Sequence, residues 1–167
     1  MPGKSVGTFS VLFVCKANLC RSPSAHGVFR KLVALHGLTS LVSVDSAGTH
    51  QRHPGDPPDE RSREHAARRG YDLSDLRARR IDAADFEVAD LILVMDDDNL
   101  GALLAVCPPA HAHKLRRLAE FCQAHTEAVV PDPYRGEPRD FDHVLDLVED
   151  ACAGVLRHVK ATLGTLS

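Results

Sequence analysis

The stretch Val11-Leu-Phe-Val-Cys15-Lys-Ala-Asn-Leu-Cys20-Arg21-Ser22-Pro23 combines a strand, a loop and the start of a helix. The apolar run, which already begins at Phe9, is rich in β-forming residues and predicts a central strand of a parallel sheet. Ser22 followed by Pro23 predicts a helix start, with Ser22 as N-cap and Pro23 where its missing N–H costs nothing. A loop entering a helix N-terminus offers backbone N–H groups and the positive end of the helix dipole, so it predicts an anion site.

Cys15 and Arg21 lie at the two ends of this loop, with five residues between them. The guanidinium of Arg21 is a planar fork that can hold two phosphate oxygens at once. Cys15 is expected at the floor of a positive bowl, where its nucleophilic thiolate form is favoured. A bare Cys-x5-Arg pair is also compatible with a buried strand-end cysteine beside a surface arginine. The preceding strand, the helix start and the second cysteine favour a phosphate-binding loop with a nucleophile at its centre.

The string Cys-x-x-Asn-x-Cys-Arg-Ser-Pro, placed near the N-terminus, resembles the signature of the low-molecular-weight protein tyrosine phosphatase family. The resemblance implies that Cys15 is the nucleophile, that Arg21 clamps the phosphate and that Ser22 donates to the cysteine sulfur. It also implies that the substrate is bound by the intervening loop residues, Lys16, Ala17, Asn18, Leu19 and Cys20. The family usually has glycine where Ala17 stands, so we expect a slightly displaced or stiffer loop here.

Asp132-Pro133-Tyr134, in a loop late in the chain, resembles the general-acid motif of the same family. The resemblance implies that Asp132 protonates the leaving oxygen and later activates water, and that Tyr134 walls the pocket and stacks on the substrate ring. Without Cys15 and Arg21 upstream, the same residues would be read as an ordinary Asp-Pro turn. Relatives commonly have a second aromatic residue after the tyrosine, whereas this chain has Arg135, so the motif does not define the substrate preference.

Ser46-Ala-Gly-Thr49 follows a predicted strand at 41–45 and resembles a turn of the family. The resemblance implies that Ser46 hydrogen-bonds Asn18 and supports the phosphate loop from beneath. Relatives often have a histidine that supports the loop asparagine, but Asp75 or Leu76 stands at that position in this chain. We therefore expect a different support for Asn18.

Strand-like and helix-like segments alternate along the chain. This pattern predicts an α/β three-layer sandwich, in which helices cover both faces of a four-stranded parallel sheet. The strand order 2-1-3-4 is implied by the family resemblance, which extends from Phe9 to the last helix. The predicted strands are 9–14, 41–45, 90–96 and 114–118, and the main helices are 22–37, 57–70, 99–106 and 141–159. We expect one domain over residues 1–167.

The composition narrows the choice of partners and location. The formal net charge is −3, which excludes a global basic field for nucleic acid, and no apolar run reaches the about 20 residues of a membrane span. The apolar run after the N-terminal residues is interpreted as a strand and not as a signal peptide. An odd number of cysteines, five, indicates reduced thiols and a cytoplasmic location. A zinc site can be drawn from five residues, but their spacing matches no standard finger, so neither a metal nor a cofactor is expected: Cys107, His111, His113, Cys122 and His125.

Taken together, these residues predict a protein-tyrosine phosphatase that works through a phosphocysteine. The expected partner is a phosphotyrosine protein, with an autophosphorylating tyrosine kinase as one candidate. Two alternatives remain at this point: a thioredoxin-coupled arsenate reductase on the same scaffold, and a non-catalytic phosphate-binding module. Cys20 also has two interpretations, a thiol that captures oxidised Cys15 as a disulfide, or a small apolar residue packed behind the loop.

Overall fold

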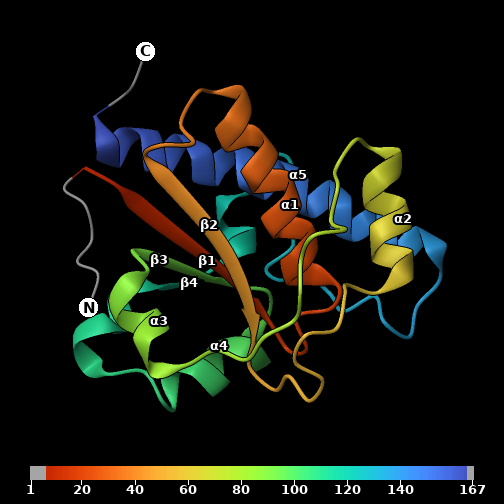
Figure 1. Ribbon diagram of the computed structural model, residues 1–167, viewed down its shortest axis with the longest axis horizontal. Helices are drawn as coiled ribbons and strands as arrows, with labels where there is room; N and C mark the ends of the chain where they lie inside the picture. The colour runs from red at the N-terminus through yellow and green to blue at the C-terminus, as the bar shows by residue number, and fades with distance from the viewer. Residues whose placement is uncertain (1–6, 165–167) are drawn as a thin grey trace.

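The computed structural model describes residues 7–164 and contains a four-stranded sheet at its centre (Figure 1). All strand pairings are parallel, in the order β2-β1-β3-β4, so the predicted fold class and strand order are confirmed. The last strand has three residues and lies at an edge of the sheet. The strands are β1 (Phe9–Cys15), β2 (Val42–Gly48), β3 (Leu91–Val94) and β4 (Leu115–Arg117).

Helices cover both faces of this sheet (Figure 1). Helices α1 (Arg21–Leu35) and α5 (Pro138–Leu163) pack against each other on one face, with α2 (Glu60–Arg68) beside them. Helices α3 (Ala83–Val88) and α4 (Asp97–Leu104) lie on the other face, and two short 3-10 helices flank β4, η1 (Pro109–Lys114) and η2 (Leu118–Phe121). The sequence patterns did not predict α3, which is held by a reciprocal capping box between Asp82 and Asp85.

The side chains of β1 divide between two hydrophobic clusters, as a strand buried on both faces requires. Val11 and Phe13 belong to the cluster beneath α1 and α5, whereas Leu12 and Val14 belong to the cluster beneath α3 and α4. Each of these side chains is at most 3% exposed. Full burial of such a side chain contributes about 1.5–3 kcal/mol, so β1 is anchored from both sides and the loop that follows it starts from a rigid base.

The start of α1 differs from the sequence prediction. The helix begins at Arg21, and its N-cap is Cys20, which makes no side-chain capping hydrogen bond. Ser22 is therefore not the cap; it lies buried in the first turn. A capping side chain would occupy the first N–H groups of the helix, and without one these donors stay available to an anion.

Strand β2 also differs, because it continues through Ser46 and Ala47 to Gly48. The predicted strand end at residue 45, with a turn at 46–49, is therefore wrong. Gly48 pairs in register with Cys15, which brings the end of β2 beside the start of the phosphate loop. The ladder hydrogen bonds of a parallel pair continue over three residues that the local pattern marked as a turn.

The longest helix, α5, has one buried face that runs its whole length. Pro138 occupies its first turn, and Gly164 ends it with a left-handed backbone (φ 72°). Among residues 7–164, no helix combines the length and the apolar character that a membrane crossing requires.

Candidate active site

Residues 16–20 form a loop between β1 and α1, at the carboxyl edge of the sheet. Three of its carbonyl oxygens accept hydrogen bonds from neighbouring segments: Lys16 from His50 N, Ala17 from Gln51 Nε2, and Leu19 from Asp59 N. The carbonyl of Cys15, at the end of β1, accepts from Thr49 N in the same way. The backbone N–H groups of residues 17–20, in contrast, donate to no group of the described chain. A loop with most of its carbonyls bound to neighbouring segments, and with free N–H groups, is arranged to receive an anion.

Asn18 holds the shape of this loop. Its backbone is left-handed (φ 56°), and no other non-glycine residue of the described chain has a positive φ. Its side-chain amide donates to Ser22 Oγ at 2.8 Å and accepts from the backbone N–H of Arg79 at 3.0 Å. Ala17 has no left-handed backbone, so alanine in place of the family's glycine introduces no conformational strain at that position.

Cys15 lies at the floor of a pocket of about 640 Å³, with its Sγ 3.1 Å from Ser22 Oγ. Because Asn18 Nδ2 already donates to Ser22 Oγ, the serine hydroxyl can donate its own proton to the sulfur. The other acceptor near this hydroxyl is the carbonyl of Ala47, at 3.4 Å. The hydroxyl is thus placed to donate to the Cys15 sulfur, as the family resemblance implies.

The side chain of Arg21 is 3% exposed and fixed from behind. Its Nη1 donates to Asp96 Oδ2 at 2.6 Å and to the carbonyl of Val130 at 2.9 Å. Asp96 follows β3 and caps α4, so the sheet and α4 together position this carboxylate. The remaining N–H groups of Arg21 form no hydrogen bond within the described chain and can meet an oxyanion. The sequence patterns alone assigned no role to Asp96.

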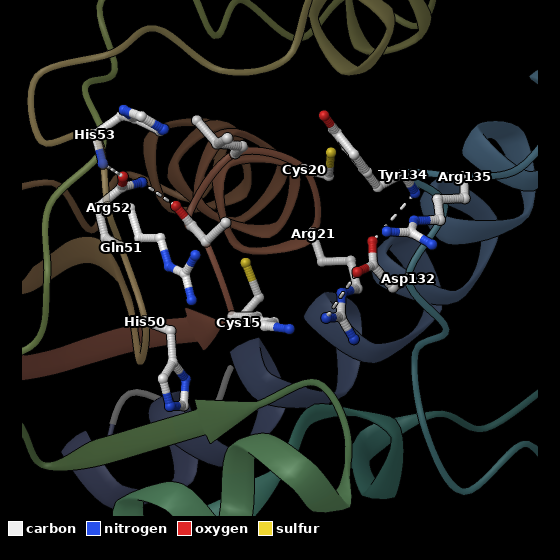
Figure 2. Close-up of a pocket in the computed structure, with 13 residues that line it drawn as sticks. Cys15, Cys20, Arg21, His50, Gln51, Arg52, His53, Asp132, Tyr134 and Arg135 are labelled. Carbon is white, nitrogen blue, oxygen red and sulfur yellow. Dashed lines mark hydrogen bonds and ion pairs between the residues drawn. The ribbon is translucent and has the colours of Figure 1, made fainter.

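Asp132 stands on the wall of the same pocket, with Oδ2 3.8 Å from Arg21 Nη2. Its other oxygen accepts the backbone N–H of Tyr134 at 3.1 Å, which fixes the turn of the motif. Tyr134 is 53% exposed and faces the pocket beside Cys20 (Figure 2). The fold therefore places the predicted acid and the predicted aromatic residue in the same pocket as Cys15, although more than a hundred residues separate both from Cys15 in the sequence.

The predicted site residues fall into two groups in space. One group lines the pocket: Cys15, Lys16, Ala17, Leu19, Cys20, Arg21, Asp132 and Tyr134. Three others, Asn18, Ser22 and Ser46, are buried and do not line it. The pocket also has a wall that the sequence analysis did not predict, formed by His50, Gln51, Arg52 and His53 (Figure 2). The contacts that place this wall are hydrogen bonds from His50 and Gln51 to the carbonyls of the phosphate loop.

Ser46 does not hydrogen-bond Asn18, so that part of the sequence interpretation is wrong. Its Oγ lies 2.9 Å from Nδ1 of His26, a buried residue of α1. Burial lowers the pKa of His26 to about 4, so the imidazole is neutral near pH 7. The backbone of Arg79 supports Asn18 instead. Asp75 takes no part in this support, since it pairs with Arg30 at 2.8 Å.

Of the five cysteines, only Cys15 and Cys20 line the pocket. Cys107, Cys122 and Cys152 do not line the pocket, and all five cysteines are free. Burial raises the pKa of the Cys20 thiol to about 12, so Cys20 is protonated near neutral pH. Within residues 7–164, no group of three or more His, Cys, Asp or Glu side chains has the arrangement of a metal site.

The site can hold a tetrahedral oxyanion above a thiol and deliver a proton to the group that leaves it, which is the chemistry of a cysteine-dependent phosphatase. Residues 10–164 match the family described as low molecular weight phosphotyrosine protein phosphatase. The chain is 40% identical over 156 residues to such an enzyme of Streptomyces coelicolor, a match that covers 92% of this chain and 94% of the relative. The human relative is 37% identical over 150 residues, which cover 89% and 94%.

A solved structure shows the same fold. The crystal structure of a protein tyrosine phosphatase from Entamoeba histolytica, with Hepes in its active site, superposes with a TM-score of 0.88 at 38% identity. That match covers 95% of this chain and all of the other. The chain belongs to the low molecular weight protein-tyrosine phosphatase family, and it is an enzyme of that class.

Proposed function

We propose that this phosphatase hydrolyses phosphotyrosine in proteins in two steps, through a phosphocysteine at Cys15. The observation that carries the proposal is the position of Cys15 in a pocket lined by the loop that follows it, in which the backbone N–H groups of residues 17–20 are free. A phosphoryl group bound in that loop has its phosphorus next to the sulfur. Arg21 then holds two of its oxygens from the side.

In the first step, the thiolate of Cys15 attacks phosphorus. The sulfur–phosphorus bond forms as the bond from phosphorus to the tyrosyl oxygen breaks, and the Asp132 carboxyl gives its proton to that oxygen. The loop N–H groups and the Arg21 guanidinium stabilise the charge that spreads over the three equatorial oxygens. The exposed ring of Tyr134 offers a face for stacking on the substrate ring.

In the second step, water replaces the sulfur. Asp132, now a carboxylate, removes a proton from the water as its oxygen attacks phosphorus, and Cys15 leaves as a thiolate. The Ser22 hydroxyl, 3.1 Å from the sulfur, stabilises the leaving thiolate. Inorganic phosphate is then released and Asp132 is again protonated, so the enzyme returns to its starting form.

Neither alternative from the sequence gains support from a specific contact. An arsenate reductase passes electrons between cysteines, and Cys107, Cys122 and Cys152 all lie outside the pocket. A non-catalytic module was suggested by Ala17 and by altered support of the loop. Ala17 is unstrained, however, and Asn18 is held by Arg79 and Ser22. The phosphatase reaction also uses Asp132, which neither alternative requires.

We infer further that the chain acts as a single phosphatase domain in the cytoplasm, on a phosphotyrosine protein such as an autophosphorylating tyrosine kinase. The family match over residues 10–164 supports the single domain, and five free cysteines support a reducing compartment. The kinase is proposed because it would carry its own phosphotyrosine and so present the substrate group directly.

The test combines two variants. Asp132→Asn should slow phosphotyrosine, whose leaving group needs a proton, by at least about 100-fold, but slow an activated aryl phosphate much less. Cys15→Ser should abolish both reactions while vanadate still binds, because the cradle remains. Equal slowing of the two substrates in Asp132→Asn, or turnover above about one hundredth of wild type in Cys15→Ser, would overturn the proposed roles.

A further inference from the structure

The mouth of the pocket carries an excess of positive charge that the phosphatase reaction does not use. The residues that line the pocket include one lysine, three arginines and a single acid, Asp132, although the whole chain has a formal net charge of −3 with histidine counted as neutral. These four cations are Lys16, Arg21, Arg52 and Arg135, and the neutral-counted His50 and His53 lie beside them. Arg21 belongs to the phosphate site and is paired with Asp96, so the excess lies with the others.

Three of these cations, Lys16, Arg52 and Arg135, have exposed side chains that form no ion pair or hydrogen bond within the described chain. Other arginines of the chain are paired with carboxylates: Arg30 lies 2.8 Å from Asp75, and Arg79 lies 2.8 Å from Asp85. The three cations at the mouth have no such partner within the described chain, so they remain available to a ligand.

The two arginines stand on opposite walls, with Cys15 between them (Figure 2). Arg52 lies in the segment that hydrogen bonds from His50 and Gln51 fasten to the phosphate loop. Arg135 lies in the turn held by the bond from Tyr134 N to Asp132 and by a second bond from Gly136 N to the Pro133 carbonyl at 2.8 Å. Both cations thus have hydrogen-bonded backbones and exposed side chains beside the place where a peptide chain would enter.

We propose that Arg52 and Arg135 select phosphotyrosyl peptides that carry acidic residues on both sides of the phosphotyrosine. This inference rests on the proposed phosphotyrosine phosphatase function and names its substrate class. With the phosphoryl group over Cys15 and the ring against Tyr134, the flanking residues pass over the two walls. Carboxylates there meet unpaired guanidinium groups, which prefer such planar acceptors. Lys16 adds a third positive charge to the field.

The experiment compares two phosphotyrosyl peptides that differ only in carrying Glu or Gln at the two positions on each side of the phosphotyrosine. A solvent-exposed ion pair changes an interaction by up to about fivefold, so two should give the Glu peptide an advantage in kcat/KM of about 5- to 20-fold at low salt. The advantage should shrink toward one at 1 M salt, where the Debye length is about 3 Å. The double variant Arg52→Gln with Arg135→Gln should lose it.

Arg157→Gln is the matched control, because Arg157 is exposed and unpaired but lies on α5, outside the pocket. It makes the same type of charge change at a distance and should keep the full Glu preference. Equal kcat/KM for the two peptides in wild type, or a preference that survives in the double variant, would overturn the inference. Hydrolysis of free phosphotyrosine distinguishes a failure of the proposed function from a failure of the proposed substrate class. If wild type does not hydrolyse free phosphotyrosine, the proposed function is contradicted. If wild type hydrolyses it but shows no Glu preference, only the substrate class is contradicted.

Discussion

Gly48 lies so close to Lys16 that a Cβ atom on the glycine would stand 2.8 Å from the lysine carbonyl oxygen. The same Cβ would lie 3.0 Å from backbone atoms of the next two loop residues. These contacts are with main-chain atoms, which cannot swing aside as the end of a long side chain does. The end of β2 therefore sets the position of the phosphate loop by direct backbone packing, and only glycine has the space to do so.

Replacing this glycine should therefore damage catalysis. We expect Gly48→Ala to displace the loop, to lower kcat/KM for phosphotyrosine by about tenfold or more, and to cost about 1–3 kcal/mol of stability. The matched control is Gly101→Ala, in α4, where a Cβ meets nothing within 4 Å. That change should preserve activity and leave stability equal or up to about 1 kcal/mol higher. Comparable activity in the two variants would show that the loop does not depend on this contact.

The hydrogen bond from the Ser22 hydroxyl to the Cys15 sulfur should support catalysis. We expect Ser22→Ala to reduce kcat by about 10- to 100-fold, since a hydrogen bond to a charged group contributes about 1.5–3 kcal/mol. The rate of Cys15 alkylation by iodoacetamide at neutral pH should also fall. Ser24→Ala is the control, because that hydroxyl donates to the Cys20 carbonyl at 2.7 Å and does not touch Cys15. An unchanged rate of Cys15 alkylation in Ser22→Ala would rule out the proposed role of this hydroxyl at the sulfur.

The elements that could be predicted from the sequence are those set by local pattern. The apolar run before Cys15 predicts a buried central strand, and the Cys-x5-Arg spacing predicts the anion loop. The structure confirms the strand and forms the loop between β1 and α1. The features that escaped prediction depend on contacts between distant segments. The local pattern marks Ser22 as a cap, but its hydroxyl lies 3.1 Å from the Cys15 sulfur. Ser46-Ala-Gly reads as a turn, but pairing with β1 extends the strand.

The same reason explains the residues that were missed at the site. A backbone N–H, such as that of Arg79 on Asn18, leaves no signature in the type of side chain at its position. The 50–53 wall is a polar loop in the sequence, and only its hydrogen bonds to the phosphate loop reveal its place. His26 occupies a helical position, and its burial against Ser46 follows from the packing of α1 on β2.

Burial of neutral His26 should make stability depend on pH. Its folded pKa, about 4, is below the ordinary value of 6.5, so the unfolded chain binds the proton first as pH falls. The contribution is therefore fully present above about pH 6.5 and is lost as pH falls toward 4, by about 3 kcal/mol. Four charged groups act on His26, and the substitution below leaves them unchanged: Arg30, Asp45, Asp75 and Arg79.

The measurement is the free energy of urea unfolding between pH 7 and pH 4. His26→Gln should show a shallower decline than wild type across this window, whereas His113→Gln, a matched change at an exposed position, should not alter the slope. Parallel curves for wild type and His26→Gln would contradict the assignment of a buried neutral imidazole.

Cys20 is predicted to protect the nucleophile from permanent oxidation. Peroxide converts the Cys15 thiolate to a sulfenic acid, and the Cys20 thiol then displaces water to form a disulfide that dithiothreitol reduces. The raised pKa of Cys20, about 12, means that this capture should quicken as pH rises. After brief peroxide exposure, wild type should recover more activity with dithiothreitol than Cys20→Ala. Equal recovery would leave Cys20 as a packing residue.

The most direct test of the account is to trap the phosphorylated enzyme. During turnover of an activated aryl phosphate, acid quenching and peptide mass spectrometry should find one added phosphoryl group on Cys15 in wild type. Asp132→Asn should accumulate more of it, since water attack loses its base. Cys20→Ala should still form it, and Cys15→Ser should show no phosphocysteine. Rapid turnover with no phosphoryl group on Cys15, or with the group on another residue, would contradict the phosphocysteine mechanism.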